Sequence, residues 1–248
     1  MEKIDVIILT NNEEDVIGDC LKSVKGWAEN IFVIDAGSTD KTVEIAKKNG
    51  AQVLEHDFKD FSDQRNFAFT KVKSSWIFYL DADERVTTEF KKEVEDKINS
   101  GEKSGFEVKR KTYYFSKNWG LEDKVARIFR VDKFIEWRGV VHETAYINGE
   151  MGLIQSPIEH FTHRNLEQML AKTNNWSKFE AKLRFDANHP PMRGWRFIRV
   201  MMSEFMRSYF KEKGYKNGTY GLIEAIYQSY SIFITYAKLW EMQNNKSD

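Results

Sequence analysis

Short, largely apolar runs alternate with amphipathic segments through the first hundred residues of the chain. The runs have the length of strands, and the segments between them repeat their apolar positions at helical spacing. This alternation of strands and helices predicts a parallel β-sheet whose strands are joined by crossover helices. Strands are predicted at residues 4–9, 31–34, 52–55 and 76–80. Helices are predicted near residues 15–24, 40–49, 62–72 and 87–99.

Turn and capping residues mark the ends of these predicted helices. Gly50 lies where the second helix is expected to end, because glycine readily adopts the left-handed conformation that closes a helix. Thr87 or Thr88 is suited to begin the fourth helix, because a threonine hydroxyl accepts a hydrogen bond from a first-turn amide. Apolar residues recur at helical spacing within that helix and predict a stripe that faces the core. They are Phe90, Val94 and Ile98.

Beyond residue 104 the pattern changes twice. Polar and aromatic loops separate irregular strand-like pieces up to residue 165, which predicts a smaller mixed or antiparallel region. From about Asn165 the pattern is helical, apart from a break at residues 188–191 that contains two prolines. The strand-like pieces lie at residues 105–110, 125–130 and 140–147.

Two helical segments near the end of the chain have unusual apolar surfaces. In residues 193–211 apolar residues share one face and arginines lie on another, as is typical of a helix at a membrane surface. Residues 222–240 are apolar almost all round, with Glu224 and Lys238 as the charged residues, which indicates burial against protein or lipid. Packing on the rest of the chain, pairing in a homodimer and peripheral membrane contact all stay open. The apolar residues of the first segment are Trp195, Ile198, Met202, Phe205 and Tyr209, and its arginines include Arg196, Arg199 and Arg207.

Charge is balanced overall and uneven along the chain. The 38 basic and 38 acidic residues cancel, so the composition gives no reason to expect a nucleic acid partner. Residues 1–165 carry 25 basic and 30 acidic residues, a net charge of −5, and residues 166–248 carry 13 and 8, a net charge of +5. The basic C-terminal part therefore suits an anionic lipid surface.

Cysteine content and apolar run lengths bear on the compartment. The single cysteine, Cys20, excludes an intramolecular disulfide framework and fits a reducing environment. No signal peptide pattern is visible at the start of the sequence. The longest uncharged run of the C-terminal part, residues 225–237, is shorter than the roughly 20 apolar residues that span a bilayer. We expect a cytoplasmic protein, with peripheral contact to the inner face of the cytoplasmic membrane as an option.

Polar side chains gather where three of the predicted strands end. Ligands of open α/β sheets bind outside the carboxyl ends of the strands, so these clusters are expected to converge. Two carboxylates one residue apart, Asp81 and Asp83, suit a divalent cation, because Mg²⁺ and Mn²⁺ combine one or two protein carboxylates with substrate phosphates. A helix cap is the alternative for such residues, and it applies most readily to Asp40. The clusters are residues 10–14, 35–40 and 81–83.

At these residues the chain resembles family 2 glycosyltransferases, which have the GT-A fold. The family pattern of Thr-x-Asn-Glu, Asp-x-Gly-Ser-Thr-Asp and Asp-x-Asp is matched in order and spacing by Thr10, Asn12, Glu13, Asp35, Gly37, Ser38, Thr39, Asp40, Asp81 and Asp83. A finer resemblance, to lipopolysaccharide inner-core glucosyltransferases, spans nearly the whole chain. Residues 64–68, 83–85, 127–130, 141–143 and 236–240 carry it.

The resemblance implies an α/β fold of the GT-A type, a Rossmann-like, mostly parallel sheet flanked by helices, with a C-terminal helical extension. It implies a catalytic domain over residues 1–165, with a nucleotide-sugar half at about 1–104 and an acceptor half at about 105–165, and an extension over 166–248. The implied reaction is inverting, metal-dependent transfer of a sugar from a nucleotide diphosphate, with UDP-glucose as an example, to a lipid-linked saccharide or a lipopolysaccharide core. A sugar nucleotidyltransferase and a non-catalytic saccharide-binding protein remain alternatives.

The same resemblance assigns roles on the donor side. Asp83 is expected to bind Mn²⁺ or Mg²⁺, and Asp81 is expected to lie nearer the ribose or the donor sugar. Arg65 is expected to contact the diphosphate, because its forked guanidinium matches phosphate oxygens. Ala36 stands where many family members have a second acid that reads the nucleotide base, which leaves the base open. The residues expected to line the nucleotide pocket are Thr10, Asn12, Glu13 and Asp35.

The catalytic base and a further metal contact are expected beyond the Asp-x-Asp pair. Glu143 follows a short apolar run where GT-A enzymes place the carboxylate that takes the proton of the acceptor. His142 is the alternative base, since an imidazole also titrates near neutral pH. The resemblance implies that His160 contacts the metal or the diphosphate, and it leaves His163 outside the site. The aromatic residues at 113–119 suit either sugar stacking or ordinary packing.

Overall fold

The computed structural model describes residues 2–140 and 143–245, so the alternative base His142 lies outside the described residues. The chain divides into two compact units. The first contains Met1–Tyr113 and Glu122–Thr162, and the second contains Tyr114–Leu121 and His163–Asp248.

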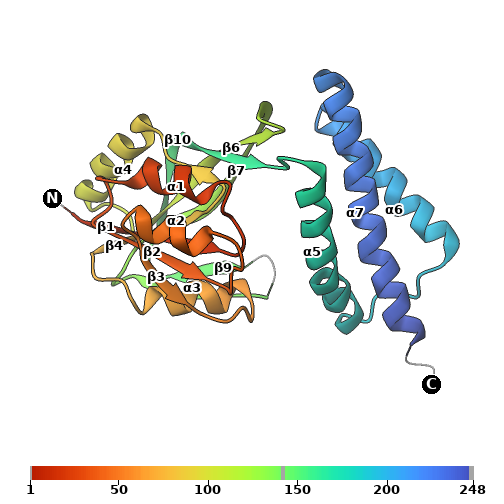
Figure 1. Cartoon of the computed structure of the whole chain (residues 1–248), viewed down its shortest axis with the longest axis horizontal. Helices are drawn as coiled ribbons and strands as arrows, with labels where there is room; N and C mark the ends of the chain where they lie inside the picture. The colour runs from red at the N-terminus through yellow and green to blue at the C-terminus, as the bar shows by residue number, and fades with distance from the viewer. Residues whose placement is uncertain (1, 141–142, 246–248) are drawn as a thin grey trace. The chain divides into compact units, whose positions relative to one another are not determined.

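Four parallel strands form one half of an eight-stranded sheet in the first unit (Figure 1). They lie in the order β3-β2-β1-β4, so that β1 pairs with β2 on one side and β4 on the other. Adjacent parallel strands need a crossover connection, and the helices between them supply it. The predicted parallel sheet is confirmed. The strands are β1 (Ile4–Thr10), β2 (Asn30–Asp35), β3 (Gln52–Glu55) and β4 (Trp76–Asp81).

The predicted crossover helices are also present, with the expected signals at their ends. The Thr87 hydroxyl accepts a hydrogen bond from the amide of Phe90 at 3.1 Å and so caps the fourth helix. Gly50 follows the second helix with a φ of 88°, in the left-handed region expected of a helix stop. Phe90, Val94 and Ile98 are buried, which confirms the core-facing stripe. The helices are α1 (Ile17–Val24), α2 (Thr42–Lys48), α3 (Phe61–Phe69) and α4 (Thr88–Ser100).

The remaining strands make the expected mixed region. β7 (Lys117–Arg130) pairs antiparallel with β4, and β10 (Met151–Thr162) pairs antiparallel with β5 (Glu84–Arg85). β6 (Gly105–Tyr114) lies between β7 and β10 in the sheet.

A separate two-stranded sheet joins β8 (Phe134–Arg138) to β9 (Thr144–Ile147). Within the described residues the strand expected at 140–147 is therefore shorter, starting at Thr144. The strands β5, β8 and β10 were not predicted. The buried side chains of β10 do not alternate, so its sequence lacks the period-two pattern of a half-buried strand.

Apolar side chains cover both faces of the parallel strands. Val6 and Phe78 belong to the core cluster on one face, and Ile7 and Tyr79 belong to the cluster on the other face, with Trp137. A strand buried on both faces is apolar along its whole length. The middle parts of these strands are therefore apolar, and the polar residues lie toward the two ends of the strands, as at Asp5 near the start of β1 and Asp81 at the end of β4.

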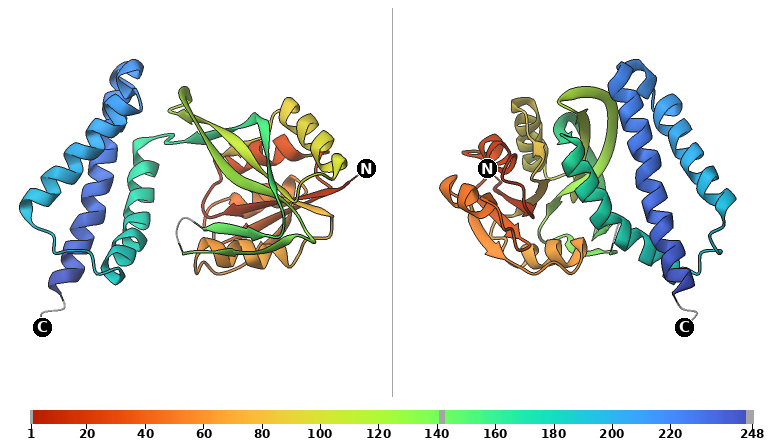
Figure 2. Two further views of the ribbon diagram at one scale, coloured as in Figure 1. Left: turned by 180° about the vertical axis from the view of Figure 1, so that it is seen from behind. Right: turned by 45° about the vertical axis from the view of Figure 1, so that its right-hand side comes forward.

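The second unit contains three long helices (Figure 2). α7 (Gly218–Asn244) packs against both α5 (Leu166–Asp186) and α6 (Gly194–Met206). A π-helical turn (Arg207–Lys211) and a 3-10 turn (Gly214–Asn217) connect α6 to α7. Within residues 2–140 and 143–245, no helix combines the length and apolar character needed to cross a bilayer.

Both unusual helical surfaces expected from the sequence keep exposed apolar side chains, and in α7 these include Leu222, Ile226, Tyr230 and Trp240, at 41–55% exposure, so the expected burial of residues 222–240 is incomplete among the described residues. The charge-poor segment lies in α7, where Glu224 is buried and accepts a hydrogen bond from His163 Nδ1 at 2.9 Å. In α6 none of the described residues is buried. Four of its large apolar residues are 50–65% exposed: Trp195, Ile198, Met202 and Met206.

Candidate active site

The carboxyl ends of three neighbouring strands meet at one edge of the parallel sheet. Thr10 of β1 is level with Asp35 of β2, and Leu9 of β1 is level with Asp81 of β4. The strand-end clusters identified in the sequence therefore share this edge, as the rule for open α/β sheets requires.

Asp35 organises the loop that follows β2. Its buried carboxylate accepts hydrogen bonds from the amides of Gly37 and Ser38, from the Ser38 hydroxyl and from the Thr10 hydroxyl, at 2.6–3.1 Å. Four donors account for nearly all the acceptor capacity of a carboxylate. In this conformation Asp35 and Thr10 set the shape of the loop that the sequence assigns to the nucleotide.

Asn12 and Glu13 attach the loop after β1 to the loop after β2. Asn12 has a φ of 56°, its amide donates to Ser38 Oγ at 2.9 Å, and its side-chain oxygen accepts from the amide of Thr39 at 2.8 Å. The amide of Glu13 donates to Thr42 Oγ1 at 2.8 Å. The two loops thus form one continuous wall at the edge of the sheet.

Asp81 at the end of β4 lies between two arginines. Its carboxylate accepts hydrogen bonds from both terminal nitrogens of Arg127, and its Oδ1 lies 3.3 Å from Nη2 of Arg65. Burial acts to raise the pKa of the Asp81 carboxyl, but the charges of Arg127 and Arg65 outweigh it and hold that pKa well below its usual range. Asp81 is therefore an ionised carboxylate at neutral pH.

Arg65 connects Asp81 to Glu143. The Arg65 Nε donates to Glu143 Oε1 at 3.0 Å, from a side chain that is 5% exposed, while the Glu143 side chain is 17% exposed. The guanidinium also lies 5.0 Å from the ring centre of Trp137. Among the described residues its third nitrogen, Nη1, is buried without a hydrogen-bond partner. A diphosphate contact for Arg65 stays a prediction, because the two nitrogens with partners face carboxylates.

Asp83 and His160 come together through a short strand pairing. β5 follows Asp83 directly and pairs with β10, and the amide of Phe161 donates to the carbonyl of Asp83 at 2.9 Å. This brings His160 Nε2 to 3.4 Å from Asp83 Oδ2, with each side chain 14% exposed. An imidazole and a carboxylate at that separation suit two ligands of one divalent cation, since ligand bonds are about 2.1 Å long. No group of three or more metal-binding side chains occurs among the residues the structure describes, so phosphate or water oxygens would complete the coordination.

Three further charged residues belong to the same cluster and received no role from the sequence. Glu84 is fully buried, accepts a hydrogen bond from the Asp81 amide at 2.9 Å, and lies 3.3 Å from Arg127 Nη2 and 3.4 Å from Arg110 Nη1. Burial raises the pKa of the Glu84 carboxyl, and the charge of Asp81 adds to that effect. Glu84 and Arg127 belong to the motifs at residues 83–85 and 127–130 that carry the family resemblance, so the sequence indicated that they matter. A motif does not show which side chains they contact, so it gave them no role.

The aromatic residues at 113–119 are packed inside their own units. In the first unit Tyr113 stacks on Phe161 at 4.7 Å, and its hydroxyl donates to Glu159 at 3.1 Å. In the second unit Trp119 is buried and contacts Tyr114. Ordinary packing accounts for these rings.

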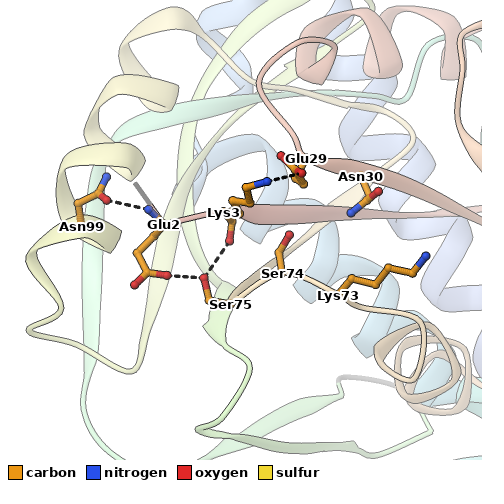
Figure 3. A pocket seen from close by; sticks show the side chains of 8 residues that line it. All are labelled: Glu2, Lys3, Glu29, Asn30, Lys73, Ser74, Ser75 and Asn99. Atoms are coloured by element: carbon orange, nitrogen blue, oxygen red, sulfur yellow. Dashed lines mark hydrogen bonds and ion pairs between the residues drawn. The ribbon is translucent and has the colours of Figure 1, made fainter.

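A polar hollow at the opposite end of the strands is not part of this site. Figure 3 shows it lined by residues that precede β1, β2 and β4, including Lys3, which donates to Glu29 at 2.6 Å. Ligand sites of parallel sheets lie at the carboxyl ends of the strands, so this hollow is on the wrong side for the chemistry.

The chain is similar to known proteins over most of its length. The profile of Glycosyl transferase family 2 matches residues 5–162. An uncharacterized glycosyltransferase of Rickettsia typhi is 26% identical over 259 residues, which cover 98% of this chain and 88% of that protein. The lipopolysaccharide core biosynthesis glycosyltransferase LpsC of Rhizobium meliloti is 25% identical over 253 residues, covering 96% of this chain and 92% of that protein. The crystal structure of S. aureus TarS overlays with a TM-score of 0.47 and 12% identity over 99% of this chain and 92% of that one.

Proposed function

The chain belongs to glycosyltransferase family 2 and has its GT-A fold, and we propose that it transfers a sugar from a nucleotide diphosphate to a saccharide hydroxyl with inversion at the anomeric carbon. The observation that carries this proposal is the hydrogen-bonded cluster of Asp81, Arg65 and Glu143 at one edge of the sheet. Asp83 and His160 lie 3.4 Å apart at the same edge. Such a reaction needs a proton acceptor for the attacking hydroxyl and a positive charge for the departing diphosphate. The cluster offers residues for both.

Glu143 is the proposed base. The hydroxyl oxygen of the acceptor forms a bond to the anomeric carbon while the bond from that carbon to the diphosphate oxygen breaks, and the hydroxyl proton passes to the Glu143 carboxylate. A single displacement of this kind inverts the configuration. Glu143 is suited to this role because it is partly exposed and its carboxylate is oriented by Arg65.

Asp83 and His160 are the proposed ligands of Mn²⁺ or Mg²⁺. His160 Nε2 lies 3.4 Å from Asp83 Oδ2, a separation that fits two ligands of one ion. When bound, the cation would neutralise the charge that develops on the departing diphosphate.

The donor is proposed to be a UDP-hexose such as UDP-glucose. Thr10, Asn12, Glu13 and Asp35 are proposed to line the nucleoside pocket, and Asp81 is proposed to lie nearer the ribose or the sugar; the hydrogen bonds that join the two loops support this assignment. The resemblance to inner-core glucosyltransferases and the similarity to LpsC support a lipid-linked saccharide or a lipopolysaccharide core as the acceptor.

Such an acceptor calls for a protein that works at a lipid surface. We propose that the enzyme is cytoplasmic and contacts the inner face of the membrane through α6. The helix exposes four large apolar residues in one stripe and carries Arg196 and Arg199 beside Trp195, which suits anionic lipid.

The proposal is tested by measuring UDP release from a panel of UDP-sugars with Mn²⁺ and a truncated lipopolysaccharide as acceptor. Wild-type protein is expected to release UDP only with metal and acceptor, and the Asp83→Asn variant is expected to lose at least 100-fold of this activity. Asp19→Asn is the matched control, because Asp19 is an exposed aspartate that pairs with the exposed Lys22. Turnover of Asp83→Asn at the wild-type rate would remove the metal role of Asp83. Absence of binding to any nucleotide sugar in a thermal-shift screen would contradict the donor class.

A further inference from the structure

Arg65 contacts both the proposed base, Glu143, and Asp81, which is proposed to lie near the donor. It lies in α3, and its Nε and Nη2 nitrogens face Glu143 and Asp81 at 3.0 Å and 3.3 Å. Glu143 and Asp81 come from different parts of the sheet architecture, the segment before β9 and the end of β4. A single planar guanidinium thus fixes the spacing of two carboxylates that are 62 residues apart in sequence.

The surroundings of Arg65 hold its side chain in one position. The backbone carbonyl of Arg65 accepts a hydrogen bond from the Tyr79 hydroxyl at 3.2 Å, and its guanidinium lies over the rings of Tyr79 and Trp137. The next residue, Asn66, exchanges two hydrogen bonds with the backbone of Trp137, at 2.9 Å and 2.8 Å. Helix α3 is therefore joined to β8 through Asn66 and to β4 through the backbone of Arg65 itself.

The two carboxylates depend on Arg65 to different degrees. Asp81 has a second arginine, Arg127, which contributes two hydrogen bonds from β7. Glu143 has Arg65 as its hydrogen-bonded cation among the described residues, and the charge of Arg127 acts on it from farther away. Loss of Arg65 would therefore leave Asp81 in place and release Glu143.

We infer that Arg65 is a positioning residue that holds Glu143 in the orientation needed to take the acceptor proton. This inference rests on the proposed function, in which Glu143 is the base. It separates Arg65 from a simple diphosphate contact, because a diphosphate contact governs donor affinity whereas a positioning residue governs the rate of the bound complex.

A double-mutant cycle between Arg65 and Glu143 tests this inference. The measurements are kcat for Mn²⁺-dependent UDP release and the Kd of the donor by calorimetry, for wild type, Arg65→Gln, Glu143→Gln and the double variant. We expect Arg65→Gln to lower kcat about 100-fold with the donor Kd within threefold of wild type, because a general base contributes about 100- to 10,000-fold. In the Glu143→Gln background the same change is expected to cost less than threefold, because its partner is already disabled.

The conservative variant Arg65→Lys tests the role of the forked guanidinium. Arg65→Lys keeps the charge but reaches one carboxylate at a time, so it is expected to recover part of the kcat lost in Arg65→Gln, and it carries the cycle if Arg65→Gln does not fold. An equal loss from the Arg65 change in both backgrounds would overturn the inference, as would a tenfold loss of donor affinity with unchanged kcat. If Glu143→Gln itself turns over at the wild-type rate, the proposed base is wrong, which is a different outcome from failure of the coupling.

Discussion

At the scale of single residues, the two acids Asp81 and Glu84 have pKa shifts in opposite directions. Both are close to Arg127, but Glu84 is fully buried and burial raises the pKa of its carboxyl. For Asp81 burial acts in the same direction, but two arginines contribute hydrogen bonds and charge that lower the pKa more than burial raises it. Glu84 also lies near two arginines, Arg127 and Arg110, at 3.3 and 3.4 Å, but the negative charge of Asp81 adds to the effect of burial and keeps its pKa raised.

This difference predicts an acid-dependent stability for Asp81. Because its folded-state pKa is lowered, the carboxylate stabilises the native state fully above the ordinary aspartate pKa of about 3.9, and that contribution is lost as the pH falls through the lowered value. Asp81→Asn is expected to lower the free energy of unfolding by roughly 2 kcal/mol at pH 7, since it leaves Arg127 with Glu84 as its remaining close acid. The difference between the urea midpoints of variant and wild type is expected to narrow as the pH falls from 7 to 2.5.

Asp19→Asn is the control for this measurement, because the Asp19 side chain is 65% exposed. Its midpoints are expected to follow wild type within about 0.5 kcal/mol at every pH. A stability gap for Asp81→Asn that is the same at pH 7 and pH 2.5 would show that the carboxylate charge is not responsible.

The site position of residues at strand ends could be predicted from the sequence. The position of residues that reach the site from the middle of other strands could not. Thr10, Asp35 and Asp81 each follow an apolar run at the end of a strand, so their position on the site edge follows from the sheet rule alone. Arg127 and Arg110 lie inside β7 and β6, where their neighbours depend on antiparallel register. No local pattern in the sequence encodes that register, so their partnership with Asp81 and Glu84 appears only in three dimensions.

At the scale of elements, α4 tests how much a single capping residue contributes. The Thr87 hydroxyl accepts the amide hydrogen bond of Phe90, and the first turn of α4 carries Glu89, which favours the positive end of the helix dipole. Thr87→Ala is expected to lower the free energy of unfolding of the first unit by about 1 kcal/mol, measured by urea denaturation.

The next residue supplies the control for that cap. Thr88 is an exposed threonine inside the first turn, and the capping hydrogen bond is made by Thr87 instead, so Thr88→Ala is expected to change stability by less than about 0.5 kcal/mol. Equal effects from the two substitutions would mean that helix propensity, and not the capping hydrogen bond, determines the result.

Helices and strands could be predicted where one regular spacing of apolar residues runs through the whole segment. β1 to β4 and α1 to α4 meet that condition, and their observed bounds differ from the predicted ones by three residues or fewer. β10 does not, because its burial is irregular along twelve residues and it contains Gly152 and Pro157. Yet β10 delivers His160 to Asp83, so the element least visible in the sequence completes the proposed metal pair.

At the scale of the whole molecule, the uneven charge matters more than the net charge of zero. Residues 1–165 carry a net charge of −5 and would be repelled by an anionic membrane, whereas residues 166–248 carry +5. Attraction to anionic lipid would therefore come from the C-terminal part, and it would weaken with salt because exposed charges are screened beyond about 10 Å at 0.1 M.

The exposed stripe of α6 adds an apolar contribution that salt does not screen. Trp195 and Ile198 are 57% and 65% exposed, among the highest values for large apolar residues among those the structure describes. Full-length protein is expected to float with vesicles of phosphatidylglycerol at 50 mM salt and to stay largely unbound with phosphatidylcholine. The double variant Trp195→Ala, Ile198→Ala is expected to bind at least tenfold more weakly at every salt concentration, because it removes buried apolar area.

Charge and apolar contact can be separated with two further variants in the same flotation assay. Arg196→Gln, Arg199→Gln is expected to weaken binding at 50 mM salt and to match wild type at 500 mM, where the charges are screened. Ile135→Ala, which removes a 48% exposed apolar residue from β8 in the first unit, is expected to bind like wild type. Equal losses for Ile135→Ala and the α6 variants would argue against a specific lipid-binding face. Binding of wild type that is independent of both lipid charge and salt would contradict the electrostatic part of the proposal.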